Sequence, residues 1–260
     1  AFVDGVKEMK GFQDESQLDL NVIQSPPRPS DFATLALPPD DIADLEDCRP
    51  GDCALKLAGE ALEEVKARID WDAPDRDAQV NRYAREQLLE VTTDYLKEGT
   101  VALERLQDKE TRISLDRQFR ELLQETPDLI SFYPELADYL RDFPESTLES
   151  SVDVLFWTLT DFGLKPTVTL NHAVAYFPAE MGDAVIAWKM VYASHYFNAG
   201  LTLTTYARDG DVAYLVQLVR IRADSLGGMF GGVKRGQMAG AVQENLLKFL
   251  RAARKNLQAQ

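Results

Sequence analysis

The sequence is poor in the side chains that most often carry metal chemistry and nucleophilic catalysis. Its 260 residues include only two cysteines and two histidines. It contains neither the Gly-x-Ser-x-Gly elbow of serine hydrolases nor the His-Glu-x-x-His helix of zinc proteases. No apolar run approaches the roughly 20 residues that a helix needs to cross a bilayer. We therefore expect no metal and no cofactor, and the sequence does not name a reaction.

The remaining composition is that of an ordinary globular protein, with 45% apolar and 27% charged residues. The net charge of -15 repels nucleic acid, so we expect no nucleic-acid partner. The charge is segregated along the chain. Residues 1–150 contain 35 acidic and 17 basic side chains, whereas residues 151–260 contain 8 acidic and 11 basic ones. The acidic part is typical of a solvated surface.

The two cysteines, Cys48 and Cys53, lie on either side of the turn signal Pro50-Gly51. Two interpretations stay open: a disulfide that closes the turn, or a redox-active pair. The neighbouring aspartates disfavour a thiolate, so we expect the disulfide and, with it, an oxidising compartment. The chain begins at Ala1, which fits either removal of a signal peptide or a trimmed sequence. We therefore expect a periplasmic or secreted protein.

The first 150 residues predict one early strand and a helical block. Alternating leucines and Val22 predict a strand over 16–24. Residues 31–58 have the composition of an irregular acidic connection, which we expect to end in a short strand at Leu55 and Leu57. Apolar residues recur every third or fourth position over 59–142. The helices that they predict end near Trp71, Gly99, Pro127 and Pro144.

From residue 152 the period changes to two, which predicts β-strands. The predicted strands cover 152–159, 166–177, 184–197, 199–208 and 212–223, with turns at Pro178, Gly182-Asp183, Asn198 to Gly200 and Asp209 to Asp211. Short connections make neighbouring strands antiparallel. A glycine-rich segment, 225–232, then precedes a helix that reaches nearly to the end of the chain.

This order of elements resembles the START-like (SRPBCC, helix-grip) superfamily, and residues 151–258 carry most of the resemblance. Segments 161–166 and 192–197 are also similar to those of uncharacterised exported bacterial proteins. The resemblance implies a single α+β domain over 1–260, in which a curved antiparallel sheet grips a long C-terminal helix. Residues 59–150 would be an enlarged helical insertion. It further implies a hydrophobic cavity between the sheet and the helix, often one for lipids or sterols.

Both histidines lie on predicted strands. His172 shares its face with apolar neighbours such as Val174, and it is either a hydrogen-bonded core residue or a group that holds a ligand hydroxyl or carboxylate. His195 follows Ser194, but adjacent strand residues point to opposite faces, so the two cannot form a nucleophile and base.

Aromatic and basic side chains complete the candidate site. Trp188, Met190, Tyr192 and Tyr196 alternate along one predicted stripe, which is either core or cavity wall. Two interpretations of Arg220 stay open. It either pairs with an acidic side chain or ligand in the interior, or it is solvated at the end of a strand. The glycine-rich loop either covers the cavity mouth or merely connects strand to helix. The candidate ligand-binding residues are His172, Trp188, Tyr192, His195, Tyr214, Arg220, Met229 and Phe230.

Three functions are compatible with these patterns. The first is binding, with or without transfer, of a hydrophobic small molecule by a monomer whose basic C-terminal helix makes transient membrane contact. The second is an enzyme that uses His172 or His195 as an acid-base group in the same cavity, with Arg220 steadying an oxyanion. The third is a protein-interaction module that binds through the acidic helices over 59–142.

Overall fold

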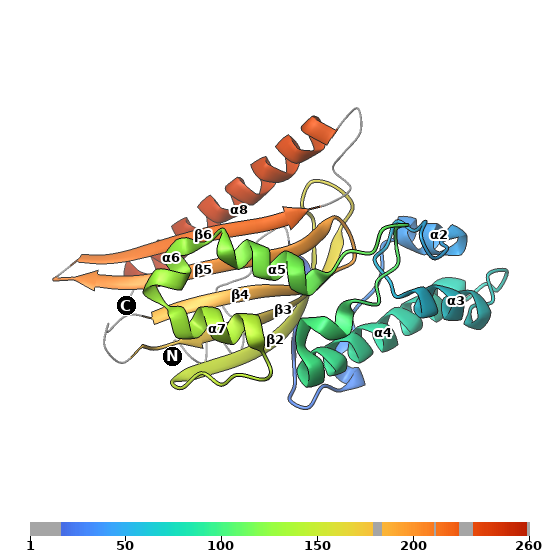
Figure 1. Ribbon diagram of the computed structural model, residues 1–260. Helices are drawn as coiled ribbons and strands as arrows, with labels where there is room; N and C mark the ends of the chain where they lie inside the picture. Colours follow the sequence, from blue (N-terminus) through green and yellow to red (C-terminus); the bar gives the residue numbers. More distant parts are fainter. Residues whose placement is uncertain (1–16, 179–183, 211, 224–230, 259–260) are drawn as a thin grey trace.

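The computed structural model describes residues 17–178, 184–210, 212–223 and 231–258, which form an α+β fold (Figure 1). Six strands form one antiparallel sheet in which each strand pairs with the next along the chain. The strands are β1 (Gln17–Ile23), β2 (Ser151–Thr160), β3 (Thr167–Tyr176), β4 (Ala184–Ala193), β5 (Phe197–Asp209) and β6 (Val212–Ala223). β1 therefore pairs with β2 although about 130 residues separate them, and β1 and β6 are the two edges.

The long segment between β1 and β2 is helical. It comprises η1 (Pro29–Phe32), α2 (Pro39–Asp47), α3 (Gly59–Arg68), α4 (Arg76–Glu98), η2 (Gly99–Leu103), α5 (Leu115–Gln124), α6 (Pro127–Phe132) and α7 (Pro134–Asp142). A last helix, α8 (Gly231–Gln258), follows the sheet. None of the helices within the described ranges is long and apolar enough to cross a membrane.

The helices lie in three places around the sheet (Figure 1). α5, α6 and α7 cover one face, and their side chains share a core with Val174, Ala187 and Leu201 of the sheet. α2, α3 and α4 lie beyond one end of the sheet and share a second core with Trp157 and Tyr192. α8 runs beside β6, and its side chains meet the opposite face of the sheet.

Gly99 ends α4 at the residue that the sequence predicts. Its φ of +72° is a conformation that side chains rarely adopt, and a Cβ there would collide with the carbonyl oxygen of Phe143. This close approach places Phe143 against the ring of Tyr95, with 5.1 Å between the ring centres. The glycine thus lets the end of α4 pack directly on the segment that follows α7.

Several predicted boundaries are wrong. Residues 31–58 contain α2, whose Pro39 lies at the helix start and whose Ile42 and Leu45 are buried. Prolines in this segment begin helices rather than only breaking them, and the same holds for α6 at Pro127. Residues 55–58 form no strand, and an isolated bridge between Ala58 and Leu106 takes its place.

The turn between β4 and β5 also differs from its prediction. It lies at residues 194–196, where Tyr196 has a φ of +55°, rather than at 198–200. Gly200 instead lies within β5, opposite Met190. A Cβ at this glycine would lie 3.0 Å from the Cβ of Met190, so the close cross-strand approach explains a glycine inside a strand.

Candidate functional site

A cavity of about 170 Å3, here named the sheet–α8 cavity, lies between the sheet and the last helix. Its apolar wall includes Phe156, Phe162, Trp188, Met190, Val219 and Ile221 from the sheet side, with Val242 and Leu246 from α8. Phe156 and Trp188 meet edge to face, with 5.5 Å between ring centres. Because strand residues alternate between faces, one face of β2 to β6 supplies this wall.

A polar network occupies part of the same wall. The Thr158 hydroxyl lies 2.9 Å from that of Thr160 and 2.8 Å from that of Thr169, and the Asn171 amide donates to the Thr169 hydroxyl at 2.7 Å. Three hydroxyls carry three hydrogens, and the two contacts among them use two. Within this network one hydroxyl hydrogen therefore remains for a ligand acceptor.

Gln217 adds an unused acceptor to the cavity wall. Its Nε2 donates to the Thr204 hydroxyl at 3.2 Å, while its Oε1 is buried and has no hydrogen-bond partner among the described residues. A buried acceptor without a partner costs about 1–3 kcal/mol. A ligand that donates a hydrogen bond here would remove that cost.

A β-bulge decides which residues face this cavity. The pairing between β3 and β4 shifts by one residue between Leu170 and Asn171, opposite Met190 and Tyr192. Trp188 and Met190 line the sheet–α8 cavity, whereas Tyr192 lies in the core on the other face. The prediction of a single aromatic stripe is therefore wrong. The extra residue at the bulge turns the side chains that follow it in β4 to the opposite face of the sheet.

His172 lies in a buried hydrogen-bond chain on the face opposite the cavity. Its Nδ1 is 2.8 Å from the Tyr95 hydroxyl, and its Nε2 is 2.7 Å from Asp153, which also accepts from the Tyr139 hydroxyl at 2.8 Å. Burial, with the nearby Tyr139 and Asp153, raises the pKa of Tyr95 well above its usual value, so its hydroxyl donates to Nδ1. His172 then donates from Nε2, and Phe143 packs on its ring with centres 4.6 Å apart.

Lys189 lies in the same layer, at 1% exposure. Its Nζ donates to the Leu140 carbonyl at 2.8 Å and lies 4.3 Å from the centre of the Phe119 ring and 5.6 Å from that of Tyr95. Burial lowers the pKa of this amine to about 7, although the Asp116 carboxylate opposes the shift. The amine thus caps the C-terminal turn of α7 from the side of the sheet.

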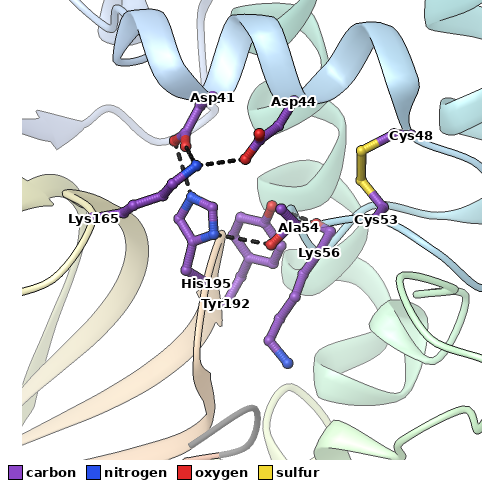
Figure 2. Close-up of a disulfide and its surroundings, with 9 residues drawn as sticks. All are labelled: Asp41, Asp44, Cys48, Cys53, Ala54, Lys56, Lys165, Tyr192 and His195. Carbon is purple, nitrogen blue, oxygen red and sulfur yellow. Dashed lines mark hydrogen bonds and ion pairs between the residues drawn. A yellow bond between two sulfur atoms is a disulfide. The ribbon is translucent and has the colours of Figure 1, made fainter. Parts of the chain in front are cut away.

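His195 ties α2 to the turn between β4 and β5 (Figure 2). Its Nδ1 donates to the Ala54 carbonyl at 2.9 Å, and its Nε2 lies 2.9 Å from Asp41. Asp41 and His195 are both almost fully buried, and Lys165 lies 3.7 Å from the other Asp41 oxygen while it also pairs with Asp44. All these contacts are internal, so they fasten α2 rather than leave a free acid-base group.

Cys48 and Cys53 form a disulfide beside this cluster (Figure 2). It joins the end of α2 to the segment that passes over β4. In that segment the Lys56 carbonyl accepts from the Tyr192 hydroxyl at 2.6 Å, and the Lys56 backbone N–H donates to the Ser194 carbonyl at 2.9 Å. The disulfide therefore fixes a segment that packs on the sheet through its main chain.

Comparisons with models of protein families, with curated proteins and with solved structures found no match. No group of three or more histidine, cysteine, aspartate or glutamate side chains in the described part of the chain is arranged to hold a metal ion.

Of the candidate ligand-binding residues that the structure describes, only Trp188 lines the sheet–α8 cavity. Tyr214 is half exposed on β6, on the face that α5 covers farther along the strand. Arg220 shares that face, and its Nε has no hydrogen-bond partner among the described residues. Met229 and Phe230 lie outside the described residues.

Sequence reasoning missed the polar half of the cavity wall. The signal was present, because threonines alternate at Thr158 and Thr160 on β2 and at Thr167 and Thr169 on β3. Threonine is common in strands for its β-branched shape alone, so the alternation does not separate a polar cavity wall from ordinary strand composition.

Proposed function

We propose that the protein binds a small hydrophobic molecule, with a hydrogen-bonding group, in the sheet–α8 cavity. The observation that supports this most is the cavity itself, in which an aromatic wall meets a threonine and asparagine network. Ligand sites typically combine a mostly apolar lining with a few directed polar groups. The remaining hydroxyl hydrogen can donate to an acceptor on the ligand, and the unpaired Gln217 oxygen can accept from a donor on the ligand.

The volume of the sheet–α8 cavity limits the size of the ligand. Pockets for drug-sized ligands are roughly 300–1,000 Å3, and an engineered apolar cavity of about 150 Å3 holds benzene. A cavity of about 170 Å3 therefore suits a single ring or a short chain segment. A lipid or sterol-like ligand would place only one end of the molecule between the sheet and α8.

We also propose the helix-grip arrangement of the START-like superfamily for this site, with the curved sheet holding α8 over the ligand. Arg251 and Arg254 are exposed on α8, and Lys248 pairs there with Glu244 at 3.1 Å. Exposed basic residues attract anionic lipid headgroups, which supports transient contact with a membrane during ligand exchange. The disulfide supports an oxidising compartment such as the periplasm.

The geometry gives no support to the enzyme alternative. Neither His172 nor His195 lines the sheet–α8 cavity, and each has both ring nitrogens within hydrogen-bond distance of an internal partner. Arg220 lies on the other face of the sheet, where its strand neighbour Arg222 pairs with Glu121 of α5.

Native mass spectrometry of protein purified without detergent tests the proposal. We expect a co-purified small molecule on the wild type. The matched pair is Thr202→Phe, which fills the sheet–α8 cavity, and Thr205→Phe, three residues along β5 and outside the cavity. Adducts on wild type and Thr205→Phe, but not on Thr202→Phe, would support the proposal. Equal adducts on both variants would contradict it.

A further inference from the structure

A second cavity, of about 100 Å3, lies on the other side of the sheet, and we name it the α4 cavity. It forms where α4 and η2 meet the segment that follows the disulfide and the ends of β3 and β4. Val168 and Tyr192, which it touches, belong to the core shared with α2 to α4. The sheet therefore separates it from the sheet–α8 cavity.

The wall of the α4 cavity is apolar. Leu55, Leu88, Val91, Leu103 and Val168 contribute to it from four different parts of the chain. Protein interiors are packed so closely that voids much larger than a water molecule are few. An apolar cavity of about 150 Å3 holds benzene, so one of about 100 Å3 has room for a short branched alkyl group.

The same cavity is bordered by charged groups of both signs. Glu90 and Asp94 are one turn apart on α4, on the face that also presents Gln87, and Arg105 follows η2. Gln87 donates to Glu90 at 3.3 Å. Within the part of the chain that the structure describes, neither the Asp94 carboxylate nor the Arg105 guanidinium has a hydrogen-bond or ion-pair partner. An apolar pocket thus opens beside one unpaired carboxylate and one unpaired guanidinium.

The wall is held firmly enough to keep its shape. The Tyr192 hydroxyl donates to the Lys56 carbonyl at 2.6 Å, and the Gln107 N–H donates to the Leu57 carbonyl at 2.9 Å. The disulfide at Cys53 anchors the same segment from its other end. A wall that is already ordered loses little conformational entropy when a ligand binds.

We propose that the α4 cavity binds a free amino acid with a branched aliphatic side chain. The side chain occupies the apolar cavity, the ammonium group meets Asp94 and Glu90, and the carboxylate meets Arg105. A guanidinium is the side chain best suited to bind a carboxylate through two parallel hydrogen bonds. This site is separate from the proposed function, because it lies across the sheet from the sheet–α8 cavity.

Three probes that share one alkyl group test the proposal by isothermal titration calorimetry on the full chain. They are L-leucine, 3-methylbutylamine, which lacks the carboxylate, and 4-methylpentanoate, which lacks the amine. We expect L-leucine to bind at least about tenfold more tightly than either analogue, which corresponds to about 1.4 kcal/mol. Equal binding of the amine and L-leucine, or no binding of L-leucine at millimolar concentration, would overturn the proposal.

Variants then assign the site. Arg105→Gln should weaken L-leucine at least about tenfold while leaving 3-methylbutylamine unchanged, and Asp94→Asn should weaken both. Arg82→Gln, on an exposed position of α4 outside the cavity, is the matched control and should bind as wild type does. Thr202→Phe should also leave L-leucine binding intact. If Thr202→Phe abolishes it, the amino acid binds in the sheet–α8 cavity and the α4 proposal fails.

Discussion

The buried amine of Lys189 makes the stability of the protein depend on pH in a predictable way. Its pKa falls from 10.5 to about 7 on folding. Because the unfolded chain holds this proton up to a higher pH than the folded chain does, stability rises with pH from about 7 to 10.5. Each pH unit in that window is worth about 1.4 kcal/mol, so the whole window amounts to about 5 kcal/mol.

Lys189→Met removes the titrating group and keeps a linear apolar chain of similar length. The variant loses the hydrogen bond to the Leu140 carbonyl, at about 1 kcal/mol, and this loss is the same at every pH. Wild type gains about 3 kcal/mol from Lys189 between about pH 6 and pH 9, and the variant gains none of it. The stability of the variant relative to wild type should therefore fall by about 3 kcal/mol over this interval.

Urea denaturation of both proteins at the two pH values measures this difference. Lys165→Met is the matched control. Burial lowers the pKa of Lys165, but its hydrogen bond to Asp44 outweighs this and the pKa is raised, so the side chain stays charged at both pH values. The control should differ from wild type by the same free energy at each pH. A Lys189→Met difference that is equally independent of pH would show that the folded protein does not lower the pKa of Lys189.

Three further changes test other parts of the fold. His172→Phe should lower the free energy of unfolding by about 1–3 kcal/mol in urea denaturation, because it leaves the buried Tyr95 hydroxyl without its partner and removes one of two hydrogen bonds to Asp153, and a loss below about 0.5 kcal/mol would contradict this. Gly200→Ala should cost about 1–3 kcal/mol by the same measurement, because the new Cβ meets Met190 at 3.0 Å, and unchanged stability would show that the strands separate freely there. Replacing Cys48 and Cys53 by serine should cost about 2 kcal/mol from the restored entropy of a six-residue loop, and wild type under reducing conditions should unfold at the same urea concentration as that variant.

The regular elements follow closely from local patterns in the sequence. Period-two alternation predicts five strands after residue 151, and each has a counterpart in the sheet. Helical spacing likewise predicts α3, α4, α5 and α7, and Gly99 ends α4 as expected. These features depend on residues within a few positions of one another, which is the range over which alternation and capping act.

The site depends on contacts that no local pattern contains. His172 finds its partner Tyr95 at a distance of 77 residues, and His195 finds Asp41 at a distance of 154. A one-residue bulge in β4 moves Tyr192 away from Trp188 and across the sheet. A prediction from alternation assumes a strand without bulges. It can therefore predict that β4 contributes to a cavity wall, but it cannot predict the residue at which β4 side chains change faces.

Calorimetric titration with 4-ethylphenol tests whether the sheet–α8 cavity binds a small hydrophobic molecule with a hydrogen-bonding group. Ethylbenzene is the analogue that lacks the hydroxyl. We expect 4-ethylphenol to bind wild type and Thr205→Phe but not Thr202→Phe, and ethylbenzene to bind wild type more weakly because Gln217 stays unpaired. Absence of binding to wild type, or equal binding to both threonine variants, would contradict the proposed binding.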